Sequence, residues 1–213
     1  MHQSKLSLFI RSYWDYYLDL EDEFLQTKKY VDFDVYNKNT YSVEFLKLMQ
    51  AVCSEVDAVA KEVASSLEST FKIDNTTNIK KWGFVLQNKL PQILTTEVVF
   101  NHSIRVIPWE NWMYEQYRDK NNTLKYRLKG NSKTPSWWLA YNDVKHQRTR
   151  LANNGHANYT KANLMNLIRS YAALYVLESE YINTMYGNQE PTDGIKNSKL
   201  FQQYYDNFKD LIY

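Results

Sequence analysis

Residues 42–63 read SVEFLKLMQAVCSEVDAVAKEV, and this stretch decides the fold class. Its apolar side chains recur alternately four and three residues apart, at Phe45, Met49, Val52, Val56, Val59 and Val63. This is the spacing of helices that pack side by side, because it gathers the apolar side chains on one face. Thr40 or Ser42 is placed to cap the start of the helix. The stretch therefore predicts a long amphipathic helix in a helical bundle, with Cys53 as a small core residue.

Further helices are predicted on either side of this stretch. Apolar residues recur three or four apart over 4–29, over 82–94 and over 162–185. The last of these segments is apolar on most of its circumference, which places it at the centre of the bundle. We expect the core to contain Phe45, Met49, Val52, Val56, Leu167, Ile168, Tyr171 and Leu174. Only five Gly and four Pro occur in 213 residues, and this scarcity of helix breakers favours long helices over turn-rich β folds.

Between residues 96 and 129, apolar residues recur at every second position instead of every third or fourth. Alternation over Val98–Val106 and over Leu124–Leu128 predicts two strands, and His102 is expected to be a buried imidazole within the first. The predicted fold class is therefore all-α (mainly), an up-and-down bundle of about five to six helices with a small β-hairpin insertion. We expect one domain over 1–186 with its insertion at 96–129, followed by a loop and an amphipathic helix at 187–213 that begins near Phe201.

Residues 137–150 read WWLAYNDVKHQRTR and hold the candidate functional residues. At helical spacing, Trp137, Tyr141, Val144 and Leu151 form an apolar stripe, whereas Asn142, His146 and Arg150 line a polar stripe. Residues 118–161 carry ten Lys or Arg and two Asp, a charge balance that suits phosphate. We expect a nucleic-acid-binding patch formed by Lys125, Arg127, Lys129, Lys133, Lys145 and Arg148. For the three residues within 125–129 the alternative is an ordinary solvated strand face.

Residues 1–70 are acidic, with twelve Asp or Glu and seven Lys or Arg. The cluster Asp19, Glu21, Asp22 and Glu23 is interpreted as a solvated helix face. It could also attract the basic middle of a second chain, which would give a homodimer.

Asn142 and His146, on a penultimate helix that precedes a long apolar helix, resemble a motif of the HEPN superfamily of α-helical bundle proteins. Known members with a working site are metal-independent ribonucleases, frequent in toxin–antitoxin and phage-defence systems, with an Arg-x(4–6)-His motif that is often Arg-Asn-x-x-x-His. Leu139, Ala140 and Tyr141 stand here at the permitted arginine positions. The resemblance implies an RNA-directed protein of a defence or regulatory system, either a metal-independent endoribonuclease or a binder that does not cut.

Cleavage of RNA without a metal needs a base for the ribose 2′-hydroxyl, an acid for the leaving oxygen and a cation for the charge on phosphorus. His146 suits the proton transfers, Arg150 could supply the charge, and Asn142 completes the catalytic set. In the opposite interpretation His146 is buried and bonded to Asn142, and Tyr141 in place of the arginine favours this structural role. The alternative function is a non-catalytic protein–protein interaction module whose basic face meets an acidic protein.

Other kinds of site have no support in the sequence. The four histidines show no metal-ligand spacing, and the single cysteine excludes a thiolate zinc site or a disulfide within one chain. No Gly-rich phosphate loop and no Gly-x-Ser-x-Gly motif occurs, so we expect no metal and no cofactor. No apolar run reaches 18 residues, and we expect a cytoplasmic protein without a membrane partner.

Overall fold

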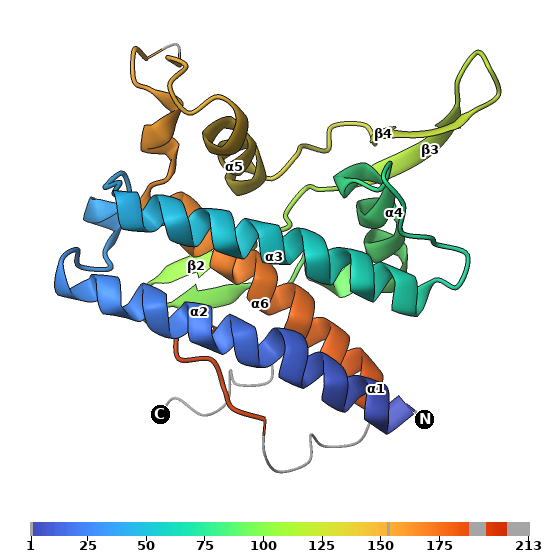
Figure 1. Ribbon diagram of the computed structural model, residues 1–213, viewed down its shortest axis with the longest axis horizontal. Helices are drawn as coiled ribbons and strands as arrows, with labels where there is room; N and C mark the ends of the chain where they lie inside the picture. The colour runs from blue at the N-terminus through green and yellow to red at the C-terminus, as the bar shows by residue number, and fades with distance from the viewer. Residues whose placement is uncertain (1, 153, 188–194, 204–213) are drawn as a thin grey trace, which may run out of the picture.

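The computed structural model describes residues 2–152, 154–187 and 195–203, and it is mainly helical (Figure 1). Its helices are α1 (His2–Phe9), α2 (Asp15–Gln26), α3 (Val43–Leu67), α4 (Ile79–Lys89), α5 (Ser136–His146) and α6 (Leu164–Tyr186). A π-helical turn, Ile10–Trp14, joins α1 to α2, and four short 3₁₀ turns lie at Thr27–Lys29, Val35–Asn37, Pro91–Leu94 and Asn158–Lys161. The prediction of a mainly helical fold is confirmed, whereas the up-and-down order of the helices stays a prediction.

The core lies where α3 and α6 cross in the middle of the molecule (Figure 1). All eight residues expected in the core are at most 1% exposed, and Cys53 is buried among them. The Ser42 hydroxyl accepts a 3.0 Å hydrogen bond from the Phe45 amide and so caps α3, as the sequence predicts. A second part of the core is a cluster of buried tryptophans from α4, α5 and the loop before β3, formed by Trp82, Trp109, Trp112, Trp137 and Trp138.

The β structure consists of two hairpins, β1 (Val98–Phe100) with β2 (Ile104–Val106) and β3 (Tyr114–Arg118) with β4 (Leu124–Leu128). The prediction of one strand over Val98–Val106 is wrong, because the chain reverses at Asn101 and His102. These residues adopt φ values of 47° and 61°, in the left-handed region of backbone conformation, which asparagine adopts more readily than most residues. His102 is exposed at this turn, so its predicted burial is also wrong.

The segment 195–203 returns along α2 and ends in β5 (Phe201–Gln203), which pairs with β1. The prediction of a helix is wrong for these three residues, and the rest of that predicted helix lies outside the described residues. Glu21 holds this segment: its carboxylate accepts hydrogen bonds from the Lys199 amide at 2.6 Å and the Ser198 hydroxyl at 2.5 Å. Glu21 is fully buried, so its interpretation as part of a solvated face is wrong. When the protein folds, the Glu21 carboxylate loses its contact with water and instead accepts hydrogen bonds from a segment that is distant in the sequence.

Candidate nucleic-acid interface

The apolar face of α5 fixes this helix to the bundle. Trp137, Tyr141 and Val144 are buried, and α5 packs against both α3 and α6. The Trp137 indole nitrogen donates a 2.9 Å hydrogen bond to the Pro108 carbonyl, which satisfies its one polar group in the core. The apolar stripe predicted through Trp137, Tyr141 and Val144 is therefore confirmed, and the opposite face of α5 is left to the solvent.

His146 is the last residue of α5, and its side chain is exposed. The Asn142 side-chain amide donates a 2.9 Å hydrogen bond to the Trp138 carbonyl, one turn back along the helix, and not to His146. The interpretation of His146 as a buried, tethered residue is therefore wrong.

Arg150 does not lie one helical turn beyond His146, and this prediction is also wrong. The chain leaves helical geometry at Gln147, where φ is −140° and ψ is 44°. The Arg150 guanidinium instead donates a 2.7 Å hydrogen bond to the Gln147 side-chain oxygen. Leu151, expected on the buried apolar stripe, is 65% exposed. We call Lys145, His146, Arg148 and Arg150, all of which are exposed, the basic end of α5.

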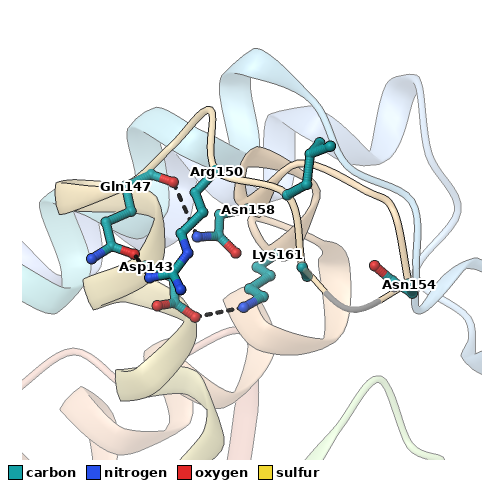
Figure 2. A pocket seen from close by; sticks show the side chains of 8 residues that line it. Asp143, Gln147, Arg150, Asn154, Asn158 and Lys161 are labelled. Atoms are coloured by element: carbon teal, nitrogen blue, oxygen red, sulfur yellow. Dashed lines mark hydrogen bonds and ion pairs between the residues drawn. The ribbon is translucent and has the colours of Figure 1, made fainter.

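A polar hollow of about 500 Å³ opens beside the basic end of α5 (Figure 2). It is lined by Asp143, Gln147, Arg150, Leu151, Ala152, Asn154, Asn158 and Lys161. Lys161 pairs with Asp143 at 2.5 Å, and the buried Asn158 donates a 3.0 Å hydrogen bond to the Gln147 carbonyl. Arg150 is the second cation of the hollow, so its walls combine two cations, one carboxylate and three side-chain amides. These groups can bind a phosphate and the polar edge of a base.

Main-chain hydrogen bonds hold the loop that carries Arg148 and Arg150. The Tyr159 amide donates to the Arg148 carbonyl at 3.0 Å, and the Asn158 amide donates to the Arg150 carbonyl at 2.8 Å. The backbone at both arginines is therefore fixed, while their guanidinium groups remain exposed. A fixed backbone limits the conformational entropy that the side chains lose when they bind a ligand.

The remaining predicted nucleic-acid-binding residues lie elsewhere. Lys125, Arg127 and Lys129 are exposed on or next to β4, in the hairpin that extends from the body of the molecule at the far side from the loop after α5 (Figure 1). Lys133 is exposed in the loop that leads from this hairpin to α5. Of the six predicted residues, only Lys145 and Arg148 belong to the basic end of α5, so the six do not form one continuous patch.

The titratable groups with strongly shifted pKa values lie outside this interface: some are buried in the core, and Glu68 and Asp74 lie in the connection from α3 to α4. Burial raises the pKa of the Glu178 carboxyl well above its ordinary range, and it raises the pKa of the Cys53 thiol. Cys53 is therefore protonated and is unsuited to nucleophilic chemistry. In the described ranges, no group of three His, Cys, Asp or Glu could hold a metal ion. No described helix combines the length and apolarity needed to cross a bilayer.

Sequence reasoning did not identify Gln147, Asn158 and Lys161 as candidate site residues. Asn158 and Lys161 belong to a segment without apolar periodicity, and they reach the hollow only because the chain folds back after Gly155. Comparisons of the chain with protein-family models, with curated proteins and with solved structures find no match.

Proposed function

We propose that this protein is directed at RNA, and that it binds single-stranded RNA through the basic end of α5 without cutting it. The observation that carries the proposal is the joint exposure of His146, Lys145, Arg148 and Arg150 at the end of one fixed helix. Three cations within six residues attract phosphates, and the polar hollow beside them offers amide groups to a base. The resemblance of Asn142 and His146 to the HEPN motif supports RNA as the ligand.

Binding without cleavage is favoured by the contacts of the residues around His146. A metal-free cut needs a cation close to the phosphorus and a partner that orients the histidine. Asn142 donates its hydrogen bond to the Trp138 carbonyl, and Arg150 donates to Gln147. With both side chains engaged in this way, His146 acts as a contact residue and not as a catalytic one.

The proposal is tested by fluorescence anisotropy with a labelled oligo-uridine RNA at increasing salt. Contacts from Lys145, Arg148 and Arg150 to three phosphates give a slope of about −2 in a plot of log affinity against log salt. Arg148→Glu combined with Arg150→Glu should weaken binding by about tenfold or more. Lys80→Glu, on the exposed first turn of α4, is the matched control and should leave the affinity unchanged.

Two outcomes would overturn the proposal. No RNA binding at low salt would favour the alternative, a protein–protein interaction module whose basic face meets an acidic protein. Cleavage of the RNA in the presence of chelator, lost in His146→Ala, would instead identify a metal-independent endoribonuclease.

A further inference from the structure

A second hollow, of about 710 Å³, lies where the end of α2 faces the start of α3. It is lined by Glu23, Gln26, Thr27, Tyr30, Val31, Ser42, Glu44 and Phe45. We call it the acidic hollow, because two of these eight residues are carboxylates and none is a cation. Among the described residues, Glu44 forms an ion pair only with Lys47, and both side chains of this pair are more than half exposed. The acidic hollow therefore fits a cationic ligand that also has apolar parts.

The connection from α2 to α3, which carries Tyr30 and Val31 of the acidic hollow, exposes several large apolar side chains. Tyr30 is 88% exposed, Tyr36 is 93% exposed and Val43 is 60% exposed. Five of the twelve large exposed hydrophobic residues of the described structure fall within residues 30–43. Several large apolar side chains exposed on one short segment are typical of an interaction surface. The surrounding segment 19–44 carries seven Asp or Glu and three Lys, a net charge of −4.

The β3–β4 hairpin has the complementary chemistry. Residues 114–133 carry six Lys or Arg and two Asp or Glu, a net charge of +4. Tyr117, Lys125, Arg127 and Lys129 are exposed, and the register pairs Tyr117 with Lys125; we call these four residues the outer face of the hairpin. The Arg127 guanidinium lies 5.0 Å from the centre of the Tyr117 ring and pairs with Glu115. Lys125 and Lys129 have no ion pair with any described residue.

The hairpin packs one face on α4 and exposes the other. Its inner face meets α4, where the rings of Phe84 and Tyr126 lie 5.5 Å apart. Beyond this contact the two strands extend away from the body of the molecule (Figure 1). The outer face of the hairpin can therefore reach a neighbouring molecule without any change in the bundle.

We propose that the acidic hollow binds the outer face of the hairpin of a second copy of this chain. The hairpin and the α2–α3 connection lie at opposite ends of the long axis (Figure 1). Two copies in antiparallel orientation therefore make the same contact twice around a two-fold axis, which closes a dimer. The lysine stems and Tyr117 cover exposed apolar side chains at the hollow such as Tyr30, while the ammonium groups of Lys125 and Lys129 approach Glu23 and Glu44.

Reversing the charge of the acidic hollow or of the outer face of the hairpin tests this pairing. Sedimentation velocity measures the oligomeric state at protein concentrations from micromolar to nearly millimolar. Glu23→Lys with Glu44→Lys reverses the hollow, and Lys125→Glu with Lys129→Glu reverses the hairpin. Each double variant alone should dimerise at least about tenfold more weakly than the wild type, because like charges then face each other in both contacts. An equimolar mixture of the two variants should recover the dimer, since every contact in the heterodimer again joins opposite charges.

Asp15→Lys and Lys80→Glu, both exposed and outside the two surfaces, are the matched controls and should leave the dimer intact. Thermal unfolding followed by circular dichroism shows whether each variant is folded. A wild-type protein that stays monomeric over the whole range would overturn the proposal, as would a dimer that neither reversal weakens or a mixture that does not recover it. A monomeric wild type whose reversed hairpin loses oligo-uridine binding would assign this face to RNA instead.

Discussion

Glu178 is a buried carboxyl group, and its protonation should make the stability of the fold depend on pH. It lies in α6 with no exposed surface, and neither side-chain oxygen has a hydrogen-bond partner among the described residues. Burial raises its pKa well above the ordinary value of 4.5, and the charge of Glu55 on α3 raises it further. Tyr13, in the π-helical turn, supplies no counter-charge, because a phenol is either neutral or negatively charged; burial and the carboxylates around it raise its pKa and keep it neutral.

The folded protein therefore holds a proton that the unfolded chain releases above about pH 4.5. The contribution of this group to the free energy of unfolding is full below pH 4.5 and is lost as the pH rises toward the folded-state pKa. The expected loss is about 1.4 kcal/mol for each pH unit in this window. Glu178→Gln has no proton to lose, so its stability relative to the wild type should increase with pH by the same slope. Urea unfolding of both proteins across this pH window measures the difference.

Two further variants show whether the effect comes from the buried carboxyl. Glu62→Gln, at an exposed position of α3, should differ from the wild type by the same small amount at every pH. Glu178→Leu also removes the unsatisfied polar group, so it should gain about 1–3 kcal/mol even below pH 4.5, less any cost of repacking. A difference between Glu178→Gln and the wild type that does not change with pH would refute the reasoning.

Three other substitutions have definite expected outcomes. Gly83→Ala would place a methyl group 2.5 Å from a Trp112 ring carbon, and it should lower the free energy of unfolding by about 1–3 kcal/mol despite the better helix propensity of Ala. Unchanged stability in urea would contradict this packing. Glu21→Ala removes the acceptor that holds segment 195–203, so trypsin should cut this segment faster than in the wild type. Equal protection would mean that β5 alone holds it. His146→Ala should change the stability by less than about 0.5 kcal/mol, and a larger loss in thermal unfolding would restore a structural role for the histidine.

The sequence by itself determined the long helices and the faces they bury. The apolar spacing of 42–63 predicted α3, and every residue expected in the core from α3 and α6 is buried. This part was predictable because helix periodicity is a local property, in which side chains three and four positions apart share a face. The exposure of the basic side chains at 125–129 also followed from the sequence, because alternation in a strand separates its two faces.

The tertiary structure alone decided which distant segments meet. Apolar and polar residues alternate over 98–106 even through the turn, so this alternation could not distinguish one long strand from a hairpin of two short ones. Nothing near Glu21 in the sequence indicates that it accepts hydrogen bonds from residues 198–200, because the donors lie 177 to 179 residues away along the chain.

The candidate interface shows the same division between local and distant information. The residue types of 137–150 predicted a polar, basic surface, but helical spacing was extended past the true end of α5 at His146. Only the fold-back of the following loop placed Arg150 against Gln147 and brought Lys161 to Asp143. The periodicity of a helix follows from neighbouring residues. Where a helix ends and which residues a loop contacts depend on the whole chain, because the fold must pair the buried hydrogen-bonding groups and bury the apolar side chains at the same time.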